Sequence, residues 1–284
     1  MRIINSHTHL IDVSEVLSKD NQHYLEYLKD IPTFSDVDEV SKMLSVENLL
    51  AQMDEAGIEK SVLFAVDAPL LTASNEFVTN ICRNYPERFI GFASVNPNRN
   101  DAYELMKNAI ENSGMKGMKF HPPLQDFFPN DNKMWPLYKL ASEFGIPVVF
   151  HVGSTPFGNL VKLKQADPLL IDDIANQFPG LKIILTHLGT LWHNESFMIA
   201  EKHPSVYIDT AAYPYEIEEL LTEKLIMRIG SEKFLFGTDF PMPYEEGMHR
   251  MLDFVDCIQN LSISDELKAM IFHRNFDQLM EDLI

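Results

Sequence analysis

The chain has 284 residues, of which 45% are hydrophobic and 23% are charged, proportions typical of a globular protein with a large core. Asp and Glu outnumber Lys and Arg by 42 to 23, which gives a formal net charge of −19. This charge repels nucleic acid and anionic membrane surfaces. A cation and a few basic side chains can still make one cleft attractive to a small, even anionic, substrate.

The length favours one domain over residues 1–284, because α/β barrels commonly form single units of about 250 residues. The N-terminal sequence lacks the pattern of a secretory signal, and no run of about 18 apolar residues follows. We therefore expect a soluble, cytoplasmic protein without a membrane span. Cys82 and Cys257 are too few for a disulfide framework and are predicted to be buried thiols.

Short apolar runs alternate with longer amphipathic segments along the chain. The predicted strands cover residues 2–9, 61–66, 89–95, 117–121, 147–151, 182–187, 206–210 and 233–239. Continuous apolar strands separated by helices indicate a parallel sheet built from repeated βαβ units. Residues 45–57 illustrate a predicted helix, which Ser45 can cap and Gly57 can end. The number of strands alone permits either a closed barrel or an open, doubly wound sheet.

Two segments fall outside this alternation. Residues 10–45 form a long polar insertion after the first strand, which we interpret as a loop or lid. The segment after residue 264 is predicted to be an extra C-terminal helix that packs on the barrel exterior.

Histidines gather at the ends of the predicted strands. Of the ten histidines, His7, His9, His121, His151 and His187 lie at carboxyl ends of strands, where barrel enzymes place their active sites. Residues two apart on a strand share a face, so His7 and His9 can face one ion. Asp239 ends the last strand. Imidazoles with a carboxylate bind zinc and related metals, which lower the pKa of a bound water to about 7.

Several motifs also match a known family. They are SHTH at 6–9, GMKFHPP at 117–123, VVFHVG at 148–153, the stretch from DPLL to THLG ending at 189, VYIDT at 206–210 and FGTDFP at 236–241. The chain resembles the amidohydrolase superfamily, in the branch that holds aminocarboxymuconate-semialdehyde decarboxylase, resorcylate-type decarboxylases and sugar lactonases. The resemblance implies a single (β/α)₈ TIM barrel, with an insertion after strand 1 and a C-terminal extra helix.

The resemblance also implies roles for individual residues. One divalent metal, zinc with manganese as the alternative, would be held by the ligands His7, His9, His151 and Asp239. Asp239 and His187 would be catalytic, because a carboxylate beside metal and water can act as general base and then as acid. His187 would stabilise a developing oxyanion.

The substrate contacts are less defined by the sequence. Lys119 and His121 share a strand face and can hold a substrate carboxylate. In other branches of the superfamily a carbamylated lysine on strand four bridges two metals. Such a bridging role is therefore an alternative for Lys119. Trp192 and Tyr213 can line a pocket for a ring, or pack within loops. Asp209 is either a further polar contact or a structural hydrogen-bond acceptor.

The main functional hypothesis is a hydrolase that uses a metal-activated water on an ester, lactone or amide of a small metabolite. The alternative is a non-oxidative decarboxylase of an aromatic or unsaturated carboxylic acid. No arginine accompanies the strand-end motifs to hold a carboxylate, although Lys119 can serve. A catalytically silent barrel is a third hypothesis, but no predicted ligand is missing from the motifs. A homodimer through the barrel exterior is also expected.

Overall fold

The computed structural model describes residues 1–11, 42–69, 71–155, 157–244 and 247–284. Most of the insertion predicted over residues 10–45 therefore lies outside the described residues. None of the helices in the described ranges has the length and apolar character that a membrane crossing requires.

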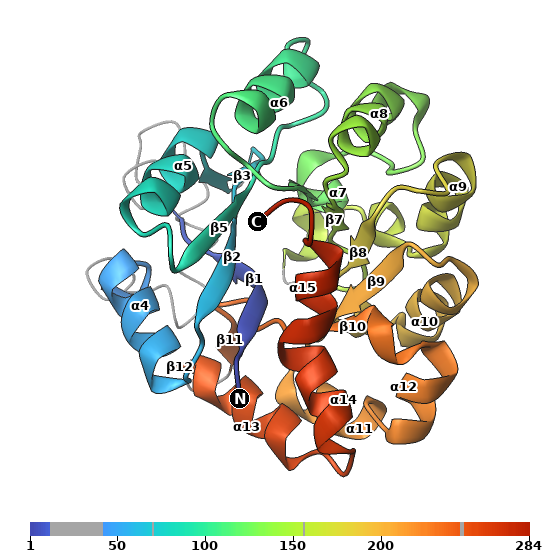
Figure 1. Ribbon diagram of the computed structural model, residues 1–284. Helices are drawn as coiled ribbons and strands as arrows, with labels where there is room; N and C mark the ends of the chain where they lie inside the picture. Colours follow the sequence, from blue (N-terminus) through green and yellow to red (C-terminus); the bar gives the residue numbers. More distant parts are fainter. Residues whose placement is uncertain (12–41, 70, 156, 245–246) are drawn as a thin grey trace.

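Within the described residues, eight parallel strands surround a common axis (Figure 1). They are β1 (Ile4–His9), β2 (Lys60–Phe64), β5 (Phe89–Phe92), β6 (Met118–Phe120), β7 (Val148–Phe150), β8 (Ile183–Leu185), β9 (Val206–Asp209) and β10 (Phe234–Leu235). Strands β1, β2 and β5 form one ladder, and β6 to β10 form another. Parallel bridges at Ala93–Met118 and Thr8–Phe240 join the two ladders at both seams. The sheet is therefore a closed TIM barrel, as predicted, and not an open sheet.

Helices cover the outside of this barrel (Figure 1). They are α4 (Val46–Glu55), α5 (Asn75–Asn84), α6 (Ala102–Glu111), α8 (Trp135–Phe144), α9 (Leu169–Gln177), α10 (His193–Lys202), α11 (Pro214–Leu220), α12 (Glu223–Ile229) and α13 (Met251–Asn260). The Ser45 hydroxyl caps α4 by accepting from the Asn48 N–H at 3.1 Å, as the sequence predicted.

Shorter elements sit in the connections. Among them are the one-turn helix α7 (Pro122–Gln125) and two small hairpins, β3 (Val66–Asp67) with β4 (Thr72–Ala73) and β11 (Pro243–Tyr244) with β12 (Gly247–Met248).

The amino-terminal mouth of the barrel is filled by apolar side chains. Strand residues such as Val62, Ile90 and Val149 point inward and form one buried cluster. The chain then continues through α14 (Asp265–Ala269), a π-helical turn (Met270–Arg274) and α15 (Asn275–Leu279). Helix α15 and the residue after it add Phe276, Leu279 and Met280 to the same cluster. The final helix therefore closes the mouth of the barrel (Figure 1), whereas the sequence suggested packing on its outer side.

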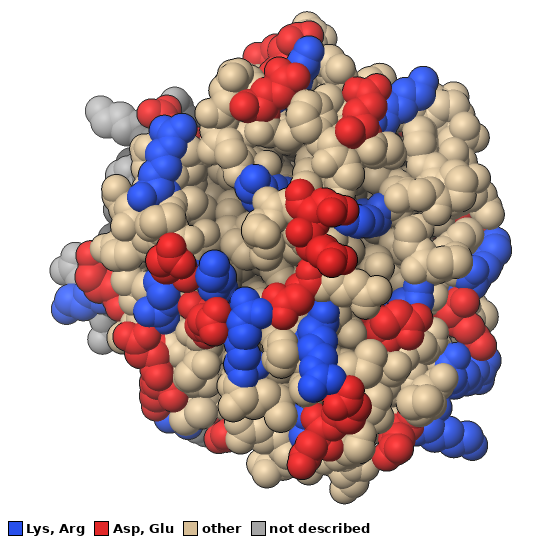
Figure 2. Space-filling view, in the orientation of Figure 1, with Lys and Arg blue, Asp and Glu red and all other residues tan. Residues whose placement is uncertain are grey.

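Charges of both signs surround this closed end, as Figure 2 shows. The Arg2 guanidinium pairs with Glu59 at 3.0 Å and with Asp277 at 2.6 Å. These groups are partly exposed, and surface ion pairs of this kind contribute about 0–1 kcal/mol. Burial of apolar side chains, more than the ion pairs, accounts for the stability of this end.

Both cysteines are free, as predicted. Cys82 is half-buried in α5 and Cys257 is buried in α13, and burial raises the pKa of each thiol to about 12.

Candidate active site

A bulge in β1 turns two histidines into the barrel. Ile4 lies in the interior cluster, so strict alternation along the strand would point His7 outward. The pairing of β1 with β2 shifts its register between Asn5 and Thr8, however, and an extra residue in a strand reverses the phase. The rings of His7 and His9 consequently lie 4.8 and 5.4 Å from the ring of Phe64 on β2, measured between centroids. The predicted shared face is confirmed, and the bulge is its cause.

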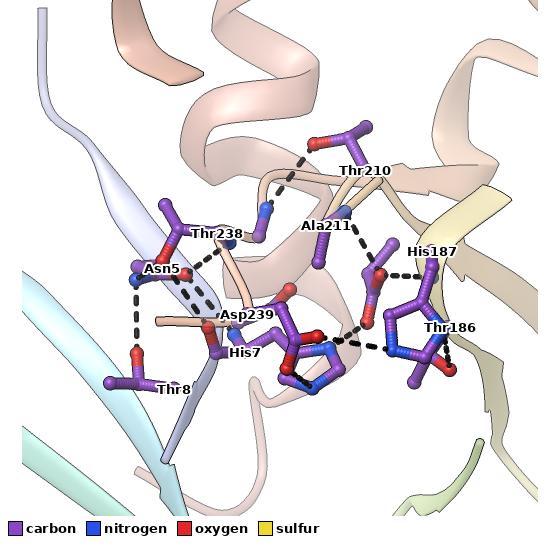
Figure 3. A network of polar contacts seen from close by, with 12 residues as sticks. Asn5, His7, Thr8, Thr186, His187, Thr210, Ala211, Thr238 and Asp239 are labelled. Atoms are coloured by element: carbon purple, nitrogen blue, oxygen red, sulfur yellow. Dashed lines mark hydrogen bonds and ion pairs between the residues drawn. The ribbon is translucent and has the colours of Figure 1, made fainter. Parts of the chain in front are cut away.

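Asn5 fixes this bulge to the other end of the chain (Figure 3). Its Nδ2 donates to the hydroxyls of Thr8 at 3.0 Å and Thr238 at 2.9 Å. Its Oδ1 accepts from the backbone N–H groups of His7 at 3.2 Å and Thr238 at 3.1 Å. Because Thr238 precedes Asp239, this single buried amide sets the relative position of two predicted metal ligands. The sequence analysis did not identify it, although a polar residue inside an apolar strand was a usable signal.

Among the described residues, His7, His9 and Asp239 form a group of possible metal donors whose ligand atoms lie within 4.8 Å of one another. The Asp239 Oδ1 lies 2.9 Å from His7 Nε2 and 3.5 Å from His9 Nε2, and the two Nε2 atoms are 3.2 Å apart. Two imidazole nitrogens and a carboxylate oxygen in this arrangement fit one divalent metal ion.

The protonation states of two of the three donors suit a cation. Burial lowers the pKa of His9 well below its ordinary value, so its ring is neutral and has a free lone pair at neutral pH. Burial alone would raise the pKa of Asp239, but the neighbouring His7 and His187 hold it well below its usual range. Burial lowers the pKa of His7, but Asp239 and Asp209 outweigh burial and raise it, so this ring would give up a proton on binding a metal ion.

Asp209, at the end of β9, contacts the His7 ring nitrogen that faces away from Asp239. Its Oδ2 lies 2.8 Å from His7 Nδ1, which leaves His7 Nε2 directed at Asp239. Its Oδ1 accepts from the backbone N–H groups of His187 at 2.7 Å and Ala211 at 3.1 Å (Figure 3). A carboxylate on the second nitrogen of a ligating histidine fixes its tautomer and orientation. Asp209 therefore combines the two roles that the sequence left open.

His187 follows β8 in a left-handed backbone conformation, with φ +56°. Its Nδ1 lies 2.8 Å from the Thr186 hydroxyl, and its Nε2 lies 3.6 Å from Asp239 Oδ2. Burial lowers the pKa of His187 to about 4. The predicted catalytic pair thus lies together in the structure.

His151 and His121 form a stack next to His187. The two rings are 3.8 Å apart and nearly parallel, and the His151 ring is 4.7 Å from that of His187. His151 Nε2 is buried and has no hydrogen-bond partner among the described residues. His151 lies outside the compact donor group of His7, His9 and Asp239, so its role as a fourth ligand stays a prediction.

Lys119 on β6 is a buried amine without a hydrogen bond. Its side chain points into the barrel, where Nζ lies 4.9 Å from the centre of the Phe64 ring and has no hydrogen-bond partner within the described ranges. Burial lowers the pKa of this amine to about 8. Since a buried polar group without a partner is costly, this amine is a candidate to bind an anionic group of a substrate.

Tyr213 and Trp192, the two aromatic side chains predicted to contact the substrate, differ in their relation to the site. Tyr213, before α11, is half-buried and stacks on Tyr215 at 5.7 Å. Burial and then Tyr215 and Asp239 raise its pKa, so it lies within electrostatic reach of the site. Trp192 is half-buried at the start of α10, where its backbone N–H donates to the Gly189 carbonyl at 2.7 Å. Substrate contact by either ring stays a prediction.

A sequence model of the amidohydrolase family matches residues 4–275, which is nearly the whole chain. The chain belongs to the amidohydrolase family, as the motifs indicated, and it is an enzyme of that superfamily.

Individual relatives are more distant. Gamma-resorcylate decarboxylase of Rhodococcus jostii (strain RHA1) is 21% identical over 298 residues, covering 80% of this chain and 86% of that protein. The structure of 5-carboxyvanillate decarboxylase from Sphingomonas paucimobilis covers 99% of both chains at 15% identity, with a TM-score of 0.74. Dihydroxybenzoic acid decarboxylase from Polaromonas sp. JS666, with bound manganese and the inhibitor 2-nitroresorcinol, is 18% identical; the match covers 99% of this chain and 97% of that one, with a TM-score of 0.73. The structural likenesses establish the shared barrel.

Proposed function

We propose that this protein is a metal-dependent, non-oxidative decarboxylase of a small aromatic carboxylic acid. The observation that carries the proposal is the buried Lys119 amine, which has no hydrogen-bond partner among the described residues and lies near the His7–His9–Asp239 group. The Lys119 amine and the rings of His7 and His9 all contact Phe64, so they border one space. The named relatives, which are decarboxylases of aromatic acids, support this alternative over the hydrolase hypothesis.

His7, His9 and Asp239 would hold one divalent ion, with His151 as the fourth ligand. Such an ion supplies Lewis acidity, which polarises a substrate oxygen bound to it. Manganese is supported by the Polaromonas relative, and zinc by the histidine-rich donor set.

Lys119 and His121 would bind the substrate carboxylate. The lysine ammonium offers a positive charge at a buried position, 2% exposed, where charge pairing is stronger than in water. The stacked His121 and His151 rings form a flat surface close to the lysine, and Tyr213 is near enough to Asp239 for its pKa to be raised by that carboxylate, after burial and Tyr215. A planar, singly charged acid is the class of molecule that fits these groups.

The reaction needs one proton at the carbon that loses its carboxylate. When the bond to the carboxyl group breaks, its electron pair stays on the ring carbon and carbon dioxide leaves. Asp239 or His187, whose Oδ2 and Nε2 atoms are 3.6 Å apart, would first take up a proton from solvent and then pass it to this carbon to complete the new C–H bond. The sum is one carboxylate and one proton converted to one arene and carbon dioxide.

A hydrolase remains the second candidate, because a carboxylate beside a metal site can also activate water toward an ester or lactone. The deciding experiment incubates manganese-loaded and zinc-loaded protein with hydroxybenzoates in D₂O and, separately, with lactones and aryl esters. We expect carbon dioxide release with one deuterium at the vacated ring carbon. Ester or lactone hydrolysis without carbon dioxide release would overturn the proposal.

Asp239→Asn provides the control for that assay. It should lower kcat by at least about 100-fold, the usual contribution of a general acid or base, while the circular dichroism spectrum is unchanged. Full activity in Asp239→Asn would show that Asp239 takes no part in the reaction.

A further inference from the structure

The loop between β8 and α10 carries an unusual concentration of left-handed backbone. His187, Leu188 and Leu191 have φ values of +56°, +53° and +67°. Residues with a side chain rarely adopt this conformation, which is strained and persists only where surrounding contacts hold it. This conformation directs the His187 ring toward Asp239, so the loop needs groups that hold it in place.

His193, the first residue of α10, contacts this loop with both ring nitrogens. Its Nδ1 lies 3.0 Å from the Leu188 carbonyl oxygen, and its Nε2 accepts from the Leu191 N–H at 3.3 Å. One neutral tautomer satisfies both contacts, with the proton on Nδ1 donating to Leu188 and the lone pair of Nε2 accepting from Leu191. The ring therefore clamps two of the left-handed residues at once.

A buried carboxylate links this clamp to the wall of the site. Glu216 on α11 is 5% exposed, and its Oε1 lies 3.5 Å from His193 Nε2. Its Oε2 accepts from the Tyr213 N–H at 3.3 Å. The hydrogen bond to Glu216 raises the pKa of His193, and when the ring takes up a proton its Nε2 donates to Glu216 instead of accepting from Leu191. Nδ1 keeps its contact with Leu188 in both states, and the protonated ring connects the His187 loop to the segment that carries Tyr213.

The segment that follows β7 packs closely against the His187–Leu191 loop and leaves the loop little room to change its conformation. The Ser154 N–H donates to the Thr190 carbonyl at 3.0 Å, and a Cβ on Gly153 would lie 2.5 Å from that same oxygen. The loop is therefore close-packed on this side, and His193 holds it from α10.

We propose that His193 is a positioning residue for the reaction, which holds the His187–Leu191 loop so that the His187 imidazole faces Asp239. The inference rests on the proposed function, because it assumes that His187 acts at the reacting centre.

The test compares three variants of the metal-loaded full chain. His193→Ala removes both contacts, whereas His193→Asn keeps a donor close to the position of Nδ1. His203→Ala is the matched control, since His203 follows the other end of α10 and pairs with Asp172 at 2.6 Å, away from the loop. We expect His193→Ala to lower kcat by about 10- to 100-fold with little change in KM, the size of effect that a misplaced catalytic group produces. His193→Asn should recover most of the loss, and His203→Ala should retain the wild-type kcat.

A second readout does not depend on turnover. The imidazole NMR signals of His187 should shift in His193→Ala and stay in place in His203→Ala. Unchanged His187 signals in His193→Ala, or an equal loss of kcat in His193→Asn and His193→Ala, would overturn the positioning role. If the decarboxylase proposal fails, the NMR comparison still decides the inference, because it reports ring position without a substrate.

Discussion

The two ends of the barrel have opposite character. At the amino-terminal end, Phe276 and Leu279 of α15 join inward-facing strand residues in a closed apolar cluster. At the carboxyl end, the same strands present buried polar groups such as His7, Asp209 and Lys119. Apolar contacts stabilise without any partner from solution, whereas polar groups at the other end are completed by a ligand. The molecule thus separates stability from chemistry along a single axis, as other TIM barrels do.

The largest effect is expected from opening the closed end. Phe276→Ala removes a side chain that is 1% exposed, and truncating a buried phenylalanine costs about 3–5 kcal/mol. Urea denaturation should show this loss in the free energy of unfolding, while the metal affinity of the folded fraction is unchanged. Met198→Ala is the control, because this side chain is half exposed and its truncation should cost under about 0.5 kcal/mol. A change in metal affinity in Phe276→Ala would contradict the separation of the two ends.

A smaller effect is expected from the carboxylate behind the metal site. Asp209→Asn leaves His7 Nδ1 without its carboxylate partner, and loss of such a partner lowers metal affinity by about 10- to 100-fold. Isothermal titration with Mn²⁺ or Zn²⁺ measures this change. Asp277→Asn, which removes a carboxylate beside Arg2 at the closed end, should bind metal like the wild type. Equal affinity in Asp209→Asn and the wild type would show that the His7 tautomer is fixed by other contacts.

The smallest expected effect concerns Lys119 and pH. Burial lowers its pKa from an ordinary 10.5 to about 8, so its ammonium is present below that pH and is lost above it. Affinity for a hydroxybenzoate should therefore fall by about tenfold as the pH rises through 8, which corresponds to about 1.4 kcal/mol. A bound metal cation would move the midpoint lower. Lys119→Met should bind weakly with no step in this range; a step that persists in Lys119→Met would assign it to another group.

Much of the architecture could be predicted from the sequence, because local composition determines it. The apolar runs around Val62, Val149 and Ile184 are buried on both faces, so their strand character is visible without tertiary information. Strand-end positions alone also indicated that His7, His187 and Asp239 converge. Their convergence follows from the barrel, since the carboxyl ends of all its strands meet at one face.

What the sequence did not reveal depends on contacts between distant segments. The bulge that turns His7 inward is held by Asn5 and Thr238, which are 233 residues apart. The left-handed conformation at His187 depends on its packing against neighbouring loops. The apolar face of α15 was recognisable, but its location at the barrel mouth was not, because an outer groove would bury the same side chains.

The seam between β1 and the end of β10 brings the three possible metal donors together. Asp239 follows His9 by 230 residues in the sequence, and the parallel bridge between Thr8 and Phe240 joins the two segments. A partly folded chain in which this seam is open would present two donors without the third, so it would hold a metal ion weakly. At the proposed metal site, an ion bound by all three donors would favour only the closed barrel and would stabilise it by mass action.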